Sequence, residues 1–319
     1  MLAGRLSRLS FRAAAAGAAA AGLGLASGAS SPLSKSDAAP PTQSVSGDLA
    51  ASPLLSRITA LEKFRTAAEP SPMVIVSPTF YPKLDDVRCQ LGLEACRRAK
   101  ALGIPLLLVD ASPPEVRTEL EKAGATVHAQ TRAGRKGAAL REAIETARST
   151  LPADGVICFQ ELEKVEMIGL NREVAAHLRR CDADICVPRR EDAAFRRSYP
   201  IEQYHQETFA NLFLDSLGAL VGLPSLDWTF GPVAFRASAA HHWLHNTGEL
   251  WDAQIVPYVR GHRWGGARVE TLSVSYVHPV AMKREEEGVT SWGEKRLLQL
   301  NFLFKHVGGA LKEDAPPAG

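Results

Sequence analysis

Residues 156–164 read VICFQELEK, an apolar run followed by two closely spaced glutamates. The apolar run 156–159 follows a glycine, which predicts a buried strand of a parallel sheet. Open α/β sheets bind ligands just beyond the carboxyl ends of such strands, where Glu161 and Glu163 stand here. Alternate side chains of an extended segment point the same way, so these two acids can converge on one site. The spacing predicts a divalent cation that holds a phosphate.

The rest of the chain alternates short apolar runs with helical patterns. Strands are expected at residues 73–76, 106–109, 126–129, 156–159, 184–187, 233–236 and 269–277. Helices are expected at residues 85–102, from 113 to about 124, and at 136–149, 200–220, 249–262 and 296–307. In the helix at 200–220, the side chains of Tyr204, Leu212, Phe213 and Leu217 are expected to face inward. Strands and helices in this order predict a parallel sheet with right-handed crossovers.

The N-terminal segment differs from the rest in composition. Residues 1–36 hold four bases and no acid, and residues 27–53 are rich in Ser, Pro, Ala and Gly. We interpret residues 1–53 as a transit-peptide-like leader with a disordered linker, which predicts an organelle, either mitochondrion or plastid; the alternative is the secretory pathway. The Ala- and Gly-rich run at 13–26 is too short and too weakly apolar for a stable membrane span.

Four regions are therefore expected. The leader is followed by a linker or short helix at 54–72, one domain at 73–307 and a disordered tail at 308–319. The 319 residues are 45% hydrophobic, which suffices for a normal core. Without the leader, acids slightly outnumber bases, so no nucleic acid partner is expected. The five cysteines have no zinc-binding spacing, and reduced thiols are expected.

Several motifs occur in an order that resembles one family. They are the run VIVSPT at 74–79, Asp110 after the second strand, the turn at 134–141, the acids after the fourth strand, FGP at 230–232 and YVHP at 276–279. Together they resemble the family-2-like glycosyltransferases of GT-A type, with mannosylglycerate-synthase-like features. The resemblance implies an α/β fold with a mostly parallel central sheet flanked by helices. It also implies a nucleoside-diphosphate sugar donor, Mn²⁺ or Mg²⁺, and an acceptor that the sequence does not identify.

The resemblance implies a metal site made of Glu161, Glu163 and His278. Members of the family typically carry Asp-x-Asp where this chain has Glu-x-Glu, so each carboxylate is about one methylene further from the backbone. Carboxylate oxygens suit hard divalent cations, and a neutral imidazole binds Mn²⁺ beside them. The alternative for the acids is a solvated salt bridge with Lys164, and the alternative for His278 is a hydrogen bond before the turn at the following proline.

Donor-binding roles are implied for Pro78, Thr79, Asp110 and Glu161, which follow the first, second and fourth strands. Arg135 and Lys136 stand before a predicted helix, whose N-terminus attracts phosphate, so they are expected beside the diphosphate. A loop cap explains Asp110 equally well, and surface charge around a glycine turn explains the two bases.

Asp252 occupies the position that the resemblance gives to the catalytic base. A base there takes the proton of the acceptor hydroxyl if the enzyme inverts configuration, whereas in a retaining enzyme it positions the acceptor. The alternative is an acid at a helix N-terminus, where the helix dipole favours it.

Two further functions remain open. The first is a non-catalytic GT-A-like scaffold that binds a nucleotide or a partner. The second is a nucleotidyltransferase, which has a glycine-rich phosphate loop after its first strand. In this chain residues 77–82 contain no glycine.

Overall fold

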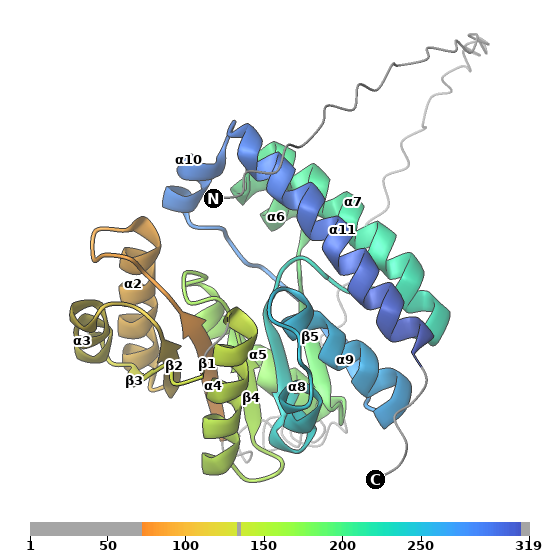
Figure 1. Cartoon of the computed structure of the whole chain (residues 1–319), viewed down its shortest axis with the longest axis horizontal. Coiled ribbons are helices and arrows are strands. Elements are labelled where there is room, and N and C mark those ends of the chain that lie inside the picture. The colour runs from red at the N-terminus through yellow and green to blue at the C-terminus, as the bar shows by residue number, and fades with distance from the viewer. Residues whose placement is uncertain (1–71, 133–134, 314–319) are drawn as a thin grey trace, which may run out of the picture. The chain divides into compact units, whose positions relative to one another are not determined.

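The computed structural model describes residues 72–132 and 135–313 (Figure 1). The predicted leader, all but the last residue of the predicted linker, and residues 314–319 of the predicted tail lie outside this part. The predicted organelle therefore stays a prediction. Within the described residues, no helix combines the length and the apolar character needed to cross a membrane.

The core of the molecule is one seven-stranded sheet. Its strands lie in the order β3-β2-β1-β4-β6-β5-β7. Their bounds are β1 (Met73–Thr79), β2 (Leu106–Asp110), β3 (Thr126–Ala129), β4 (Val156–Phe159), β5 (Ile185–Arg190), β6 (Val233–Arg236) and β7 (Val269–Val274). Only β6 runs antiparallel to its neighbours β4 and β5. The predicted α/β class with a mostly parallel sheet is confirmed.

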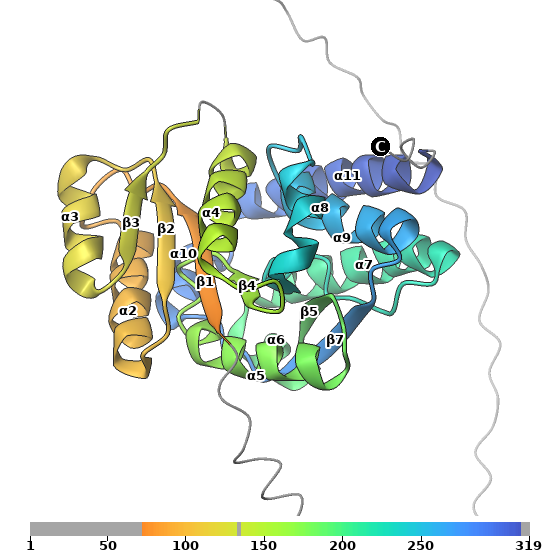
Figure 2. The ribbon, with the colours of Figure 1, turned by 90° about the horizontal axis from the view of Figure 1, so that it is seen from below.

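Helices cover both faces of the sheet (Figure 2). They are α2 (Val87–Leu102), α3 (Pro114–Ala123), α4 (Lys136–Thr150), α5 (Met167–Arg180), α6 (Asp192–Ser198), α7 (Ile201–Gly218), α8 (His241–Leu244), α9 (Asp252–Gly265), α10 (Val280–Glu286) and α11 (Thr290–Lys312). Two 3₁₀ turns lie at Ala219–Val221 and Ala237–Ala240. α11 reaches Lys312, past the predicted end of the domain at 307.

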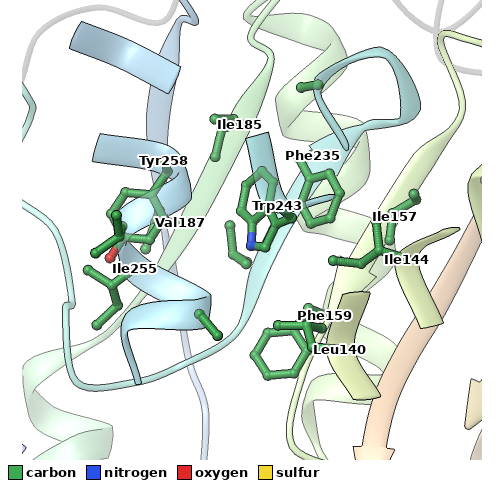
Figure 3. Packing of buried hydrophobic residues seen from close by; sticks show 14 of the residues in the cluster. Leu140, Ile144, Ile157, Phe159, Ile185, Val187, Phe235, Trp243, Ile255 and Tyr258 are labelled. Atoms are coloured by element: carbon green, nitrogen blue, oxygen red, sulfur yellow. The ribbon is translucent and has the colours of Figure 1, made fainter. Parts of the chain in front are cut away.

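The sheet separates two hydrophobic cores, as the alternation of side chains along β1 shows. Val74 and Val76 belong to one core and Ile75 to the other. In the first core, side chains of α4 and α9 pack on the sheet, and the rings of Phe235 and Trp243 stack 3.8 Å apart (Figure 3). Burial of these apolar surfaces is the main term that stabilises the sheet between its helices.

The inward face of α7 differs from the prediction. Leu212 is 67% exposed and Phe213 40% exposed, so the prediction that they face inward was wrong. The buried face instead carries Glu207, whose carboxylate pairs with the buried Arg190 of β5. A charged residue on the buried face masks the apolar periodicity from which the orientation was inferred.

The site is positioned by the point where the strand order reverses. The strand order reverses at β1, because β2 and β3 lie on one side of it and β4 lies on the other. Crevices at such switch points are where open α/β sheets bind ligands. Residues 77–82 after β1 and 160–164 after β4 meet at this edge.

Candidate functional site

A cavity of about 500 Å³ opens at the carboxyl ends of β1, β2 and β4. Its volume lies in the range of small-molecule sites. The predicted site residues that line it are Pro78, Thr79, Arg135, Lys136, Glu161, Glu163 and His278. Asp110 and Asp252 are not among the lining residues.

Asp110 is fully buried beneath the cavity wall. Its Oδ2 accepts hydrogen bonds from Thr79 Oγ1 at 2.6 Å and from Ser112 Oγ at 2.8 Å, and its Oδ1 accepts from the Ser112 amide at 2.8 Å. Ser112 Oγ in turn accepts from the amide of Tyr81. Asp110 therefore fixes the loops after β1 and β2, and it holds Thr79 at the cavity.

Glu161 stands at the centre of a group of cations. Its Oε1 accepts hydrogen bonds from Lys136 Nζ at 2.8 Å and from Gln254 Nε2 at 3.2 Å. Lys164 Nζ lies 3.4 Å from its Oε2. Gly231 packs so closely that a Cβ there would lie 2.7 Å from Oε2. The carboxylate is thus held by two ammonium groups and a close backbone.

The two lysines set the charge state of this group. Burial alone would raise the pKa of Glu161, but Lys136 and Lys164 lower it far below its usual range. Burial alone would lower the pKa of Lys164, but the Glu161 carboxylate raises it above its usual value. At neutral pH, Glu161 is therefore ionised and Lys164 is protonated.

Glu163 and His278 belong to a second group of charges on the cavity wall. Arg88 lies 3.6 Å from Glu163 Oε1 and 3.8 Å from Glu286 Oε1. His278 Nε2 lies 3.4 Å from Glu286 Oε2, yet neither atom makes a hydrogen bond. Burial lowers the pKa of His278 despite the opposing effect of Glu286, so its imidazole is neutral at pH 7.

The predicted metal ligands do not form one ligand set. Divalent cations bind their ligands at roughly 2.0–2.6 Å, which requires the donor atoms to converge. In the part of the chain that the structure describes, the one trio of potential ligands that converges within 4.8 Å is His177, Cys181 and Glu270, and none of these lines the cavity. A cation at Glu161 Oε2 would also lie close to the Lys164 ammonium. Two unit charges 4 Å apart repel by about 4 kcal/mol at an effective dielectric of 20, and a divalent ion doubles this. Glu161 therefore does not fit the role of metal ligand in this arrangement.

Asp252 has local contacts at the start of α9. Its Oδ1 accepts a hydrogen bond from the Leu250 amide at 2.9 Å, and its Oδ2 lies 3.6 Å from His306 Nδ1. The neighbours of Asp252 that do line the cavity are Trp251 and Gln254. These contacts suit an acid at a helix start, and the role of base stays a prediction.

The N-terminus of α4 borders the cavity, as predicted for Arg135 and Lys136. The Arg135 amide donates to Glu249 Oε2 at 2.8 Å, and Glu249 also pairs with Arg141. A Cβ at Gly137 would lie 2.0 Å from the carbonyl oxygen of Gly248, so only glycine allows this approach. The contact fixes the first turn of α4 and directs Lys136 to Glu161.

Sequence reasoning missed four cations of the cavity wall. Lys164 was weighed only as a salt-bridge partner, although its position three residues after Glu161 was a signal. Arg88, Lys295 and Arg296 also line the cavity, and the last two lie on α11 beside Trp292. Burial, then Arg296 and Arg88, lower the pKa of Lys295 to about 8, despite the opposing effect of Glu286 and Glu163.

Comparison with known proteins identifies the class of fold. No family model and no curated protein matches the chain. A solved structure that it resembles is glucosyl-3-phosphoglycerate synthase of M. tuberculosis, at 13% identity and a TM-score of 0.50, over 78% of this chain and 83% of that one. Two others are mannosyl-3-phosphoglycerate synthase of Rubrobacter xylanophilus (11% identity, TM-score 0.45, 80% of each chain) and a CMP-2-keto-3-deoxy-manno-octonic acid synthetase with CTP (13%, 0.39, 73% of this chain and all of that one). The fold is therefore that of GT-A-like nucleotide-sugar transferases, as predicted. At such identities the likeness establishes the fold alone.

Proposed function

We propose that the protein is a glycosyltransferase that moves a sugar from a nucleoside-diphosphate sugar to a small acidic acceptor. The observation that carries the proposal is the cavity at the switch point of a GT-A-like sheet, with cations on its wall. Ligands of open α/β sheets bind at this place, and cations are the groups that a diphosphate needs.

The donor would lie across the ends of β1, β2 and β4. Pro78 and Thr79 at the end of β1 and Ala111 after β2 provide a wall for the nucleoside. Lys136 and Arg135 at the start of α4 provide positive charge for the diphosphate. Two predicted donor-binding residues do not touch the donor in this arrangement. Asp110 acts through Thr79, and Glu161 acts through Lys136.

The acceptor would lie toward α11. Arg88 of α2 and Arg296 of α11 pair with acids there, whereas Lys295 lies over the ring of Trp292 with no acid within 4.0 Å among the described residues. Such a wall suits a hydroxyl compound that carries a carboxylate or phosphate. The M. tuberculosis neighbour is a synthase of a glucosylated 3-phosphoglycerate, which contains an acid of this kind.

The reaction breaks the bond between the sugar C1 and the diphosphate oxygen, and forms a bond from C1 to the acceptor oxygen. The acceptor hydroxyl passes its proton to water in the open cavity, and negative charge develops on the leaving diphosphate. Fixed cations stabilise this charge, because they need no reorganisation during the reaction. The predicted Mn²⁺ or Mg²⁺ enters no step here, because two ammonium groups already lie against the Glu161 carboxylate.

A panel of nucleotide sugars tests the proposal by thermal stabilisation. A donor at a hundred times its Kd stabilises the folded state by about 2.7 kcal/mol, which a melting curve detects. Release of nucleoside diphosphate is then measured with hydroxy acids as acceptors. Stabilisation without release under any acceptor would favour the scaffold, and release of pyrophosphate from a nucleoside triphosphate and a sugar phosphate would identify a nucleotidyltransferase. A panel without any stabilising nucleotide sugar would refute the proposal.

A further inference from the structure

The charges around Glu161 lead to a second conclusion, which rests on the proposed function. Lys136 and Lys164 reach this carboxylate from different parts of the fold, the first from α4 and the second from the loop after β4. Their side chains are 31% and 19% exposed, and both line the cavity. Two ammonium groups against one carboxylate leave a net positive charge on the wall.

Lys164 has bonding capacity left over. An ammonium group has three donor hydrogens. Among the residues that the structure describes, the Lys164 ammonium donates no hydrogen bond; it faces Glu161 Oε2 at 3.4 Å and the ring of Phe230 at 5.7 Å. The Glu161 carboxylate beside it favours the charged form of the ammonium. A charged group with free donors at a cavity wall is suited to an anion.

Glu161 holds this pair in place and is itself enclosed. Besides the lysines it accepts a hydrogen bond from Gln254, and Gly231 leaves no space beside Oε2. A ligand that enters the cavity therefore meets the ammonium groups rather than a free carboxylate.

We propose that Lys136 and Lys164, oriented by Glu161, bind the diphosphate of the donor directly, so that donor binding requires no divalent cation. Glu161 is then a positioning residue for the lysine pair, not a metal ligand. The two ammonium groups supply the two positive charges that a divalent ion would bring. As the C1–O bond breaks, the electron pair goes to the diphosphate oxygen, and the lysine pair stabilises the added charge.

Calorimetric titration of the full chain tests this assignment. Nucleoside diphosphates (UDP, GDP, ADP and CDP) and the corresponding nucleosides are titrated in EDTA and in Mn²⁺. We expect the best diphosphate to bind in EDTA with an affinity within tenfold of that in Mn²⁺. In Lys164→Gln and in Lys136→Gln we expect its affinity to fall at least tenfold, while the affinity of the nucleoside is unchanged. Lys122→Gln is the matched control, because Lys122 is an exposed lysine of α3 that pairs with Glu119; this variant should bind as the native protein does.

Glu161→Gln separates the positioning role from metal binding. The substitution keeps the shape of the side chain and releases both lysines from their counter-charge. We expect diphosphate binding in EDTA to persist within tenfold, whereas loss of a metal ligand would abolish binding that depends on Mn²⁺. Melting temperatures without ligand identify any variant that fails to fold. If one lysine variant does not fold, the diphosphate affinity of the other lysine variant tests the proposal.

The outcomes are distinguishable. Binding more than tenfold weaker in EDTA than in Mn²⁺ would overturn the assignment and leave the proposed function intact. Losses below tenfold in both lysine variants would overturn it as well. Absence of binding by every diphosphate in both buffers would remove the proposed function, and this assignment with it.

Discussion

Two groups of buried charges lie near the ends of strands, and they differ in how far their hydrogen bonds are satisfied. In the closed cluster, Arg190 at the end of β5 donates to Asp227 twice at 2.7 Å and to Glu207 at 2.7 Å. In the open cluster around Glu161, Lys164 donates no hydrogen bond within the described residues, and Glu161 Oε2 accepts none.

The difference separates a structural role from a binding role. Arg190 is 4% exposed, and the pairing with Asp227 and Glu207 offsets its burial, so that its pKa lies well above the usual value. Such a cluster stabilises the fold and has little left to offer a ligand. The Lys164 ammonium has donor hydrogens left over at the cavity wall, and an anion can accept them. The open cluster is therefore better suited to bind an anion than the closed cluster is.

Breaking the closed cluster should have the largest effect. Arg190→Met leaves the buried carboxylate of Asp227 without its main counter-charge, and it leaves Glu207 with Arg296 as its guanidinium partner. Removal of one partner from a buried ion pair destabilises by about 3–5 kcal/mol. Denaturant unfolding measures the loss. The exposed neighbour Arg189 gives the control, since Arg189→Met should stay within about 0.5 kcal/mol of the native protein. A loss below about 1 kcal/mol in Arg190→Met would show that the closed cluster does not stabilise the fold.

A moderate effect is expected when the open cluster is crowded. Gly231 has a φ of +100°, and a Cβ there would meet Glu161 Oε2 at 2.7 Å. Gly231→Ala should cost about 1–3 kcal/mol in unfolding free energy, because it adds backbone strain to a steric clash. It should also weaken binding of nucleoside diphosphates, because the Glu161 carboxylate moves with its lysines.

Gly288→Ala is the matched control for this variant. Gly288 has a φ of +74°, and a Cβ there would meet nothing within 4 Å, so the substitution brings the strain without the clash. Equal losses of stability and of nucleotide affinity in the two variants would contradict the role of Gly231 at Glu161.

The sequence predicted the sheet well where strands are buried on both faces. The bounds of β4 and β6 match the prediction, and the acids after β4 line the cavity. The helices were predicted less completely than these strands. Helix α5 was not predicted, although its buried residues follow helical spacing. The buried face of α7 was predicted wrongly, because Glu207 lies on that face.

The site was predictable only as far as local sequence determines it. Glu161 and Lys164 are neighbours in the chain, but Lys136 reaches Glu161 only because Gly137 packs against Gly248. Lys295 of α11 arrives at the same cavity through tertiary packing alone. The identity of the charged residues could therefore be predicted, whereas the pairing that decides between a metal site and a lysine pair could not.

The smallest effect is a change of stability with pH that separates Glu161 from an ordinary surface acid. Lys136 and Lys164 lower the pKa of Glu161 in the folded protein, despite the opposing effect of burial. A carboxyl whose pKa is lower when folded contributes stability above its unfolded pKa of about 4.3, and this is lost as pH falls through the folded pKa. We expect the unfolding free energy of the native protein to exceed that of Glu161→Gln by about 1 kcal/mol at pH 6. The difference is small because the lysine ends face the cavity and its solvent. The difference should shrink below about pH 4. Denaturant unfolding at a series of pH values measures it, and Glu94→Gln, an exposed position on α2, should show no such difference. If the difference in unfolding free energy between the native protein and Glu161→Gln grew as the pH fell, the two lysines would not hold this carboxylate in its ionised form.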